Sequence, residues 1–293
     1  MKVHLVDGTY ELFRYHYGPT PSHITAEGLD VKATRGVANS MLQLLESGAT
    51  HVGVATDHVI PSFRNELYAG YKDGSGVEPE LSAQFPVVEE LLDALGFVVF
   101  PMVEYEADDA MGAAAVIAAA DDRVEQVVLC TPDKDLGQCV GGKVFQLDRR
   151  KDHLYGVEGV REKFGVGPES IADYLALVGD AADGFPGLPG WGAKSAAAVL
   201  ARYGHLEDIP KDSHDWDVDV RSASKLAMTL KDQFDDALLF RVIATIQTDA
   251  PTITNVDELL WTGPKDDAAA VAERYDAGNI LQRAIRLAGN RTA

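Results

Sequence analysis

The stretch VHLVDGTYELF, residues 3–13, joins an apolar, β-branched run to a carboxylate and a glycine. The alternation of apolar residues before Asp7 predicts a buried strand, and Gly8 predicts a turn directly after it. Asp7 therefore stands at the carboxyl end of this strand, the edge of a parallel sheet where ligands bind. A carboxylate at that position predicts either a nucleophile or a metal ligand.

The same pattern recurs along the first half of the chain. Apolar runs predict strands over residues 51–57, 97–103 and 127–133, and helical spacing predicts helices over 33–47, 81–95 and 107–120. This alternation predicts an α/β fold with a mainly parallel central sheet flanked by helices. From about residue 160 the pattern turns helical around the glycine-rich segment 179–204. We expect an α/β domain over residues 1–168 and a helical domain over residues 169–293.

Composition limits the classes of protein to consider. The chain has 293 residues, of which 46% are hydrophobic and 25% charged, enough for one large core or two smaller ones. No apolar run reaches the roughly 20 residues of a membrane span, and residues 1–13 lack the layout of a signal peptide, so we expect a soluble, cytoplasmic protein. Cys130 closes an apolar run and is expected to be a core residue rather than half of a disulfide with Cys139.

Nine carboxylates stand at the ends of predicted elements rather than on their solvated faces. Each alone is also explained as a helix-terminal acid or a turn residue. Together they would converge on one sheet edge, where they repel one another unless cations neutralise them. Oxygen ligands without a His/Cys cluster favour Mg²⁺ or Mn²⁺ over zinc. The nine are Asp7, Asp57, Glu106, Asp108, Asp109, Asp133, Asp135, Asp180 and Asp183.

The segments that hold these acids resemble, in order and spacing, the motifs of the 5′-nuclease superfamily, which comprises flap endonucleases and the 5′–3′ exonuclease domain of bacterial DNA polymerase I. The likeness spans nearly the whole chain and implies a PIN-like fold without a polymerase part. It also implies a stand-alone, divalent-metal-dependent hydrolase that cuts DNA with 5′ ends or flaps in replication or repair. A monomer is expected, and a replication or repair protein as its partner is left open. The matching segments are VDGTYELFR, PSFRNELYAGYK, YEADD, TPDKDL and GDAADGFPGLPGWGAKSA.

The resemblance also implies roles for the acids. In the family two or three ions bind the scissile phosphate, activate a water and stabilise the leaving oxygen, so that no protein nucleophile is needed. Inner-site ligands would be Asp7, Asp57, Glu106, Asp108 and Asp133, of which Asp108 and Asp133 are also expected to be essential for catalysis. Outer or bridging ligands would be Asp109, Asp135, Asp180 and Asp183.

DNA contact must be local, because the formal net charge is -20. In the family a helix-three-turn-helix element holds duplex DNA, commonly with a K⁺ ion on its turn carbonyls, so K⁺ is a further expectation. An arch near residues 62–85 steers the scissile phosphate through Arg64 and Lys72, with Tyr71 as a DNA contact, and Arg14 matches an early DNA-contacting position. The helix-three-turn-helix contacts would be Gly187, Gly190, Gly192, Lys194 and Ser195.

Departures from the family pattern and rival functions remain. Asp73 and Ser75 replace a common basic position in the arch, and Ala182 and Gly184 alter the usual GDxSDN motif. A non-catalytic binder of branched DNA and a PIN-type ribonuclease are the alternatives, while a phosphoaspartate phosphatase is disfavoured by Leu5. The sequence leaves open the balance of exonuclease and endonuclease action, the preferred flap length, the physiological metal and the reason for the acidic charge.

Overall fold

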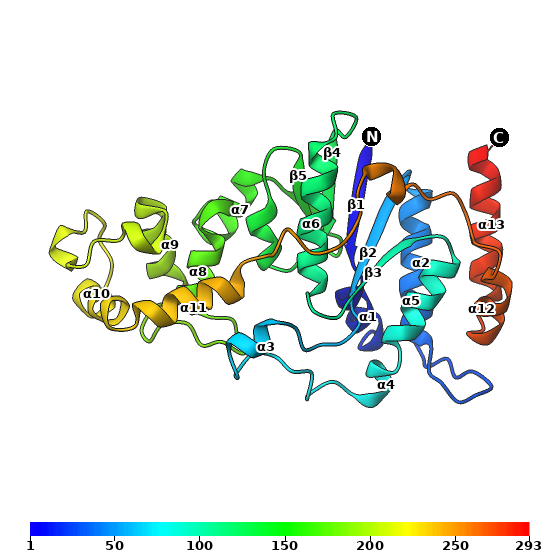
Figure 1. Ribbon diagram of the computed structural model, residues 1–293, viewed down its shortest axis with the longest axis horizontal. Helices are drawn as coiled ribbons and strands as arrows, with labels where there is room; N and C mark the ends of the chain where they lie inside the picture. The colour runs from blue at the N-terminus through cyan, green and yellow to red at the C-terminus, as the bar shows by residue number, and fades with distance from the viewer. Residues whose placement is uncertain (293) are drawn as a thin grey trace. The chain divides into compact units, whose positions relative to one another are not determined.

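The structure is a computed structural model that describes residues 1–292 (Figure 1). The chain divides into two compact units, and each is assembled from separate stretches of sequence. The first unit comprises Met1–Ile60, Gly74–Thr131 and Gln247–Ala293, and the second comprises Pro61–Asp73 and Pro132–Ile246. These units follow contacts in space rather than order along the chain, so the predicted boundary between residues 168 and 169 stays a prediction.

The first unit is built on four parallel strands. They are β1 (Lys2–Asp7), β2 (His51–Asp57), β3 (Val98–Met102) and β4 (Gln126–Cys130), and their order is β3-β2-β1-β4. All seven residues of β2 are buried, as expected for a parallel strand covered on both faces. Because the strands are parallel, their carboxyl ends lie at one edge of the sheet. The predicted α/β class with a mainly parallel sheet is confirmed.

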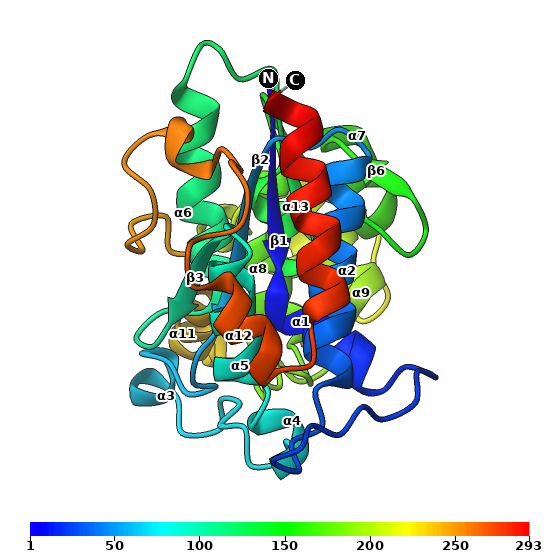
Figure 2. The ribbon, with the colours of Figure 1, turned by 90° about the vertical axis from the view of Figure 1, so that its right-hand side faces the viewer.

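Helices cover both faces of these strands. Figure 2 shows α6 (Ala107–Ala120) on one side of β1 and α2 (Lys32–Glu46) on the other. Ala110, Ala114 and Ala118 on α6 are fully buried, and such small side chains let the helix approach the strands closely. The unit also contains α1 (Gly8–His16), α4 (Pro79–Ser82), α5 (Phe85–Ala94), η5 (Val256–Leu259), α12 (Ala268–Arg274) and α13 (Gly278–Thr292).

Three local predictions were wrong. Helix α1 begins at Gly8 without a turn, because the Asp7 carboxylate caps it by accepting from the Tyr10 N–H at 2.7 Å. The predicted helix over 81–95 is two helices, α4 and α5, since Pro86 in the first turn of α5 cannot continue a helix from before it. The strand predicted over 127–133 ends at Cys130.

The second unit is mainly helical. The helices that contribute to its core include α8 (Ile171–Val178), α9 (Ala193–Tyr203), α10 (Ala223–Asp232) and α11 (Phe234–Ala244). Phe185 stacks on Phe240 of α11 with 5.7 Å between ring centroids, inside a core that also contains Trp191 and Leu177. The unit also holds α3 (Arg64–Leu67), η1 (Asp135–Cys139), the antiparallel hairpin β5 (Val144–Asp148) and β6 (His153–Tyr155), α7 (Val157–Phe164), η2 (Pro168–Ser170), η3 (Leu206–Asp208) and η4 (Ser213–Asp215).

The glycine-rich loop between α8 and α9 closes tightly on itself. Gly179 and Gly187 have φ angles of 82° and 65°, a region that favours glycine. A Cβ added to Gly187 would lie 2.4 Å from the backbone nitrogen of Gly179, so neither position tolerates a side chain without a shift of the backbone. The closed loop fixes Asp180 and Asp183, which lie between these glycines.

Among residues 1–292, no helix is both long enough and apolar enough to cross a bilayer.

Candidate metal centre

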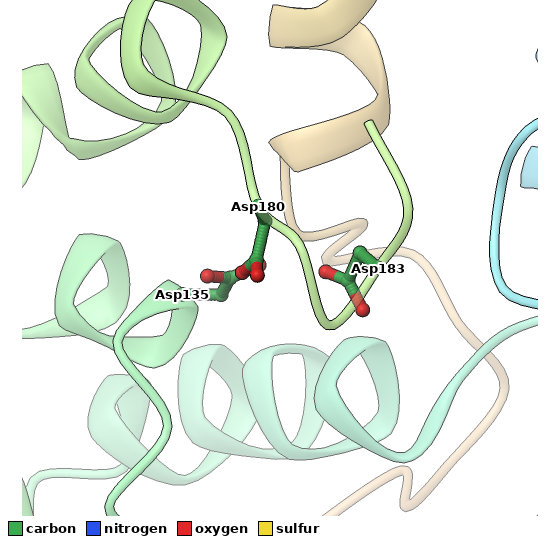
Figure 3. Close-up of side chains that lie close together, drawn as sticks. All are labelled: Asp135, Asp180 and Asp183. Atoms are coloured by element: carbon green, nitrogen blue, oxygen red, sulfur yellow. The ribbon is translucent and has the colours of Figure 1, made fainter. Parts of the chain in front are cut away.

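The second unit brings together three of the nine predicted metal ligands. One carboxylate oxygen from each of Asp135, Asp180 and Asp183 lies within 4.8 Å of the other two. Figure 3 shows the three side chains directed toward one another from η1 and from the loop after α8. Asp135 and Asp180 are buried, and Asp183 is half-buried. These three residues, the acidic triad below, have the donor set that a hard divalent cation requires.

Local hydrogen bonds hold the triad in place. The Asp180 carboxylate accepts from the Ala182 N–H at 2.9 Å, and backbone bonds in both directions join Asp180 to Phe185. Asp133 lies just before η1, and its carboxylate accepts a hydrogen bond at 3.0 Å from the N–H of Asp135, the triad residue on η1. The Asp133 side chain is exposed. The sequence places these acids on short turns, which fix their direction more firmly than a long flexible loop would.

The buried acid of the triad carries an electrostatic penalty. Burial raises the pKa of the Asp135 carboxyl well above its ordinary value, and the nearby charges of Asp133, Asp183 and Asp180 raise it further. Its Oδ1 atom is buried and accepts no hydrogen bond from any residue that the structure describes. A carboxylate oxygen in this condition fits a cation ligand, since a cation would both neutralise the charge and satisfy the oxygen.

Two lysines lie against the triad. The Lys134 ammonium lies 2.8 Å from Asp180 Oδ2, and the Lys72 ammonium lies 2.9 Å from Asp183 Oδ1. Burial alone would lower the pKa of Lys134, but the bond to Asp180 and the charges of the neighbouring acids outweigh burial and raise it. Lys72 therefore contacts a predicted outer-site ligand. This contact is separate from the role in phosphate steering that the sequence predicts for Lys72.

In the first unit, two predicted ligands follow adjacent parallel strands. Asp7 ends β1, and its Oδ2 accepts from the Thr131 hydroxyl at 2.9 Å. Asp57 ends β2, where its Oδ1 accepts from the Ala107 N–H at 2.8 Å and its own N–H donates to the Thr9 hydroxyl. Both carboxylates are thus oriented at the carboxyl edge of the sheet, as the strand pattern predicted.

The remaining acids of the first unit stand at the start of α6. Glu106 and Asp109 form a capping box, in which Asp109 Oδ2 accepts from the Glu106 N–H at 2.9 Å. Asp109 is fully buried, and its Oδ1 also accepts from the Gln247 N–H at 2.8 Å. Asp108 lies between them and is half-buried. The contacts of Asp109 are structural, and its predicted metal role stays a prediction.

The predicted arch contributes one buried cation and one buried ring to the second unit. Arg64 is 2% exposed, and its guanidinium donates to the carbonyls of Ile243 and Thr245 at the end of α11, at 2.7 and 3.0 Å. Tyr71 is buried in the core of the same unit. These contacts join residues 61–73 to the helical core, while the predicted parts of Arg64 in catalysis and of Tyr71 in DNA contact stay predictions.

The predicted helix-three-turn-helix segment opens onto a cavity of about 630 Å³. Gly192 precedes α9, and its N–H donates to the Ser195 hydroxyl at 3.1 Å. Gly190, Gly192, Lys194 and Ser195 all line this cavity, together with Arg221 from a later loop, whereas Gly187 is buried in the loop closure. In the first unit, Arg14 is ion-paired with the buried Glu11 and lies over the Tyr15 ring.

Sequence reasoning missed three residues that orient the acids: Thr9, Thr131 and Lys134. Thr131 donates to Asp7 from the residue after β4, the strand beside β1. Its place directly after an apolar strand is a signal that could have identified it. Lys134 stands between two candidate ligands in TPDKDL, and a cation among acids is a comparable signal.

Comparison with known proteins places these features in a family. Residues 2–165 match the family model described as 5′-3′ exonuclease, N-terminal resolvase-like domain. Residues 166–267 match the model described as 5′-3′ exonuclease, C-terminal SAM fold. DNA polymerase I of Pseudomonas aeruginosa is 35% identical over 293 residues, covering 96% of this chain and 31% of the relative. DNA polymerase I of Bacillus subtilis is 33% identical over 289 residues, covering 96% and 32%. The chain thus spans about a third of the length of the curated relatives it matches.

Among solved structures, a flap endonuclease of bacteriophage T5 in a pseudo-enzyme-product complex with DNA and metal ions has a similar fold. The TM-score is 0.66 at 20% identity, and the alignment covers 99% of this chain and 100% of the other. At that identity the likeness speaks for the fold alone, and it agrees with the predicted α/β domain followed by a helical region.

Proposed function

Because the chain belongs to the 5′–3′ exonuclease family, we propose that it is a divalent-metal-dependent 5′ nuclease that hydrolyses phosphodiester bonds of DNA bearing 5′ ends or flaps. The observation that carries the proposal is the acidic triad, in which buried Asp135 has an oxygen without a hydrogen-bond donor among the described residues. Acids that serve only to cap turns would have both oxygens satisfied by backbone N–H groups or water.

The donor set of the triad fits Mg²⁺ or Mn²⁺. Carboxylate oxygens suit these hard cations. The triad contains neither histidine nor cysteine, the ligands that zinc favours. We assign Asp135, Asp180 and Asp183 to an outer ion with Asp109, and Asp7, Asp57, Glu106, Asp108 and Asp133 to an inner one. When bound, such ions would polarise the scissile phosphate and lower the pKa of the attacking water.

The residues of the chain then have defined tasks. The backbone bonds of the 180–185 turn and the Thr131 hydroxyl orient Asp180 and Asp7 before substrate arrives, so little reorganisation is needed during the reaction. The Lys72 ammonium lies in the same region as the triad and supplies a positive charge that can hold a phosphate oxygen. No side chain needs to act as a nucleophile.

DNA would be held where the acidic chain offers local cations. Lys194 is exposed at the start of α9, where the helix dipole also favours a phosphate, and Arg221 lines the same cavity. This supports the predicted duplex-binding role of the helix-three-turn-helix segment. The proposal also includes a K⁺ ion on that segment, a monomeric state, a cytoplasmic location and a role in replication or repair.

The proposal is tested by incubating the purified protein with end-labelled flapped, nicked, single-stranded and RNA substrates, with Mg²⁺ and with EDTA. We expect cleavage near the 5′ end of flapped or nicked DNA in Mg²⁺ and none in EDTA. Cleavage of RNA alone would favour a PIN-type ribonuclease. Binding of branched DNA without cleavage in Mg²⁺ or Mn²⁺ would favour a non-catalytic binder.

A further inference from the structure

Lys134 is placed differently from an ordinary surface lysine. It lies between Asp133 and Asp135 in sequence, yet its ammonium pairs at 2.8 Å with Asp180, which follows α8. Its side chain is 35% exposed, so the ammonium retains a path to solvent. Lys134 thus binds across the second unit to a carboxylate of the acidic triad rather than to either acid beside it.

Lys72 has the equivalent contact with another carboxylate of the triad. Its ammonium lies 2.9 Å from Asp183, and its backbone N–H donates to the carbonyl of the same residue at 2.9 Å. Two of the three triad carboxylates therefore carry an ammonium group each. Asp135 accepts no hydrogen bond at Oδ1 from the described part of the chain.

The lysines compete with a divalent cation for the carboxylates of this group. The triad and Asp133 carry four negative charges when ionised, and the ammonium groups of Lys134 and Lys72 already offset two of them. A hard cation also takes carboxylate oxygens at about 2.0–2.6 Å, in the directions where an ammonium would otherwise donate. Like charges this close repel strongly in a partly buried site.

We propose that Lys134 is a resident counter-ion of the acidic triad, which neutralises Asp180 while the outer site is empty and is displaced when a divalent cation binds. This inference rests on the proposed function, because it concerns the same metal centre. The exchange keeps the acids together in the metal-free protein, and it weakens metal binding by the free energy needed to break the Lys134–Asp180 pair.

The direct test is Mn²⁺ binding, measured by isothermal titration calorimetry without DNA, to the wild type and to Lys134→Met. We expect Lys134→Met to bind Mn²⁺ about tenfold more tightly, equivalent to about 1.4 kcal/mol, and to unfold at a lower temperature when metal-free. Lys151→Met is the matched control, because Lys151 pairs with Asp148 in the same unit outside the triad. That variant loses the same charge and should keep the wild-type Mn²⁺ affinity.

Equal or weaker Mn²⁺ binding by Lys134→Met would overturn the inference and show that Lys134 positions Asp180 for the metal instead. Tighter binding by both lysine variants would also overturn it, since net charge alone would then explain the effect. Failure of the wild type to bind Mn²⁺ would overturn the metal centre itself. These outcomes separate failure of the inference from failure of the proposed function.

A second measurement uses the wild type and does not depend on the folding of a variant. Acetylation of individual lysines is followed by peptide mass spectrometry with and without saturating Mn²⁺. Displacement from Asp180 should make Lys134 react faster in Mn²⁺, while Lys194, on the exposed start of α9, should react at an unchanged rate. A Lys134 rate that stays the same or falls on metal addition would contradict the exchange.

Discussion

At position 135 a carboxylate is buried beside other acids, an arrangement that costs free energy in a metal-free protein. Burial and the charges of Asp133, Asp183 and Asp180 all disfavour its ionised form. Within the second unit, the ammonium groups of Lys134 and Lys72 offset the negative charges of the acids next to Asp135. A backbone N–H of the turn also donates a hydrogen bond to the Asp180 carboxylate. We therefore expect the Asp135 carboxylate to lower the stability of the metal-free protein and to serve as a ligand when a cation binds.

Asp135→Asn should make the metal-free protein more stable. The amide keeps the size of the side chain but removes the buried charge, so we expect the free energy of unfolding to rise by about 1 kcal/mol. Urea denaturation in EDTA measures the change. Asp266→Asn, at an exposed position, is the control for the change in net charge. A loss of stability in Asp135→Asn would identify the carboxylate as a structural acceptor.

Arg64 is a charged residue whose hydrogen bonds are expected to stabilise the fold. Arg64→Ala would leave the carbonyls of Ile243 and Thr245 without their donor, and we expect it to cost about 2–4 kcal/mol. Arg64→Lys should lose less, since it can retain one bond. Urea denaturation distinguishes these variants, with exposed Arg150→Ala as the control. If Arg64→Ala lost cleavage but unfolded like the control, the predicted catalytic role would be the correct one.

At the scale of elements, α8 is fixed by an ionic network as well as by its apolar face. Asp173 on α8 is buried, and it accepts from His205 Nδ1 at 2.8 Å and from Arg241 of α11 at 3.0 Å. The hydrogen bond to Asp173 raises the pKa of His205 above its ordinary value, more than burial lowers it. Protonated His205 thus helps hold α8, the helix from which Asp180 follows.

This contact predicts a pH dependence of stability. Because the folded-state pKa of His205 is raised, its contribution is fully present below the unfolded-state pKa of about 6.5 and is lost as the pH rises through the folded-state value. His205 is half-exposed, so solvent limits the contribution to less than about 1 kcal/mol. The unfolding free energies of the wild type and His205→Gln should differ at pH 5.5 and converge above pH 8, and a difference that did not change with pH would contradict this role of His205.

The start of α9 offers a clean test of DNA contact. A Cβ added to Gly192 meets nothing within 4 Å, so Gly192→Val should fold normally and yet obstruct a phosphate approaching the helix N-terminus. We expect duplex DNA to bind at least several-fold more weakly, measured by fluorescence anisotropy at constant salt. Gly278→Val is the matched control, because Gly278 also opens a helix and is equally unobstructed. Unchanged affinity in Gly192→Val would make this segment a structural turn only.

Apolar periodicity predicted the elements of the sheet better than the turns between them. The buried run Val3 to Val6 identified β1, but Gly8 was interpreted as a turn residue although it starts a helix. Glycine is needed at this position because a side chain has no room: a Cβ there would lie 2.8 Å from the Ala55 carbonyl oxygen on β2. Such a close approach depends on a strand more than forty residues later, which local pattern does not reveal.

The candidate site was predictable in its residue types and less so in its contacts. The acids at the ends of predicted elements included Asp135 and Asp180, which were predicted to be ligands, and the structure brings both side chains into the triad. The counter-ion Lys134 and the burial of Arg64 depend on pairings between segments distant in sequence. The same holds for the compact units, which join separate stretches of chain.

For the whole molecule, the formal net charge of -20 is compatible with the proposed DNA substrate only if part of that charge serves to bind cations. Carboxylates that bind metal contribute to the formal charge without repelling DNA once they are loaded. The remaining acids still disfavour DNA at long range, so affinity should depend on a few local contacts and on divalent ions. The central claim is therefore that the acidic triad binds a cation used in cleavage.

The most direct test is the rate of Mg²⁺-dependent cleavage of a 5′-flapped DNA at saturating protein, compared between the wild type and Asp135→Asn. Asp135→Asn should slow cleavage by roughly 100-fold or more, as the loss of a major electrostatic stabiliser of the transition state does. DNA affinity in Ca²⁺, measured on the same substrate, should remain close to that of the wild type. Cleavage by Asp135→Asn at nearly the wild-type rate would contradict the assignment of the triad as the metal centre.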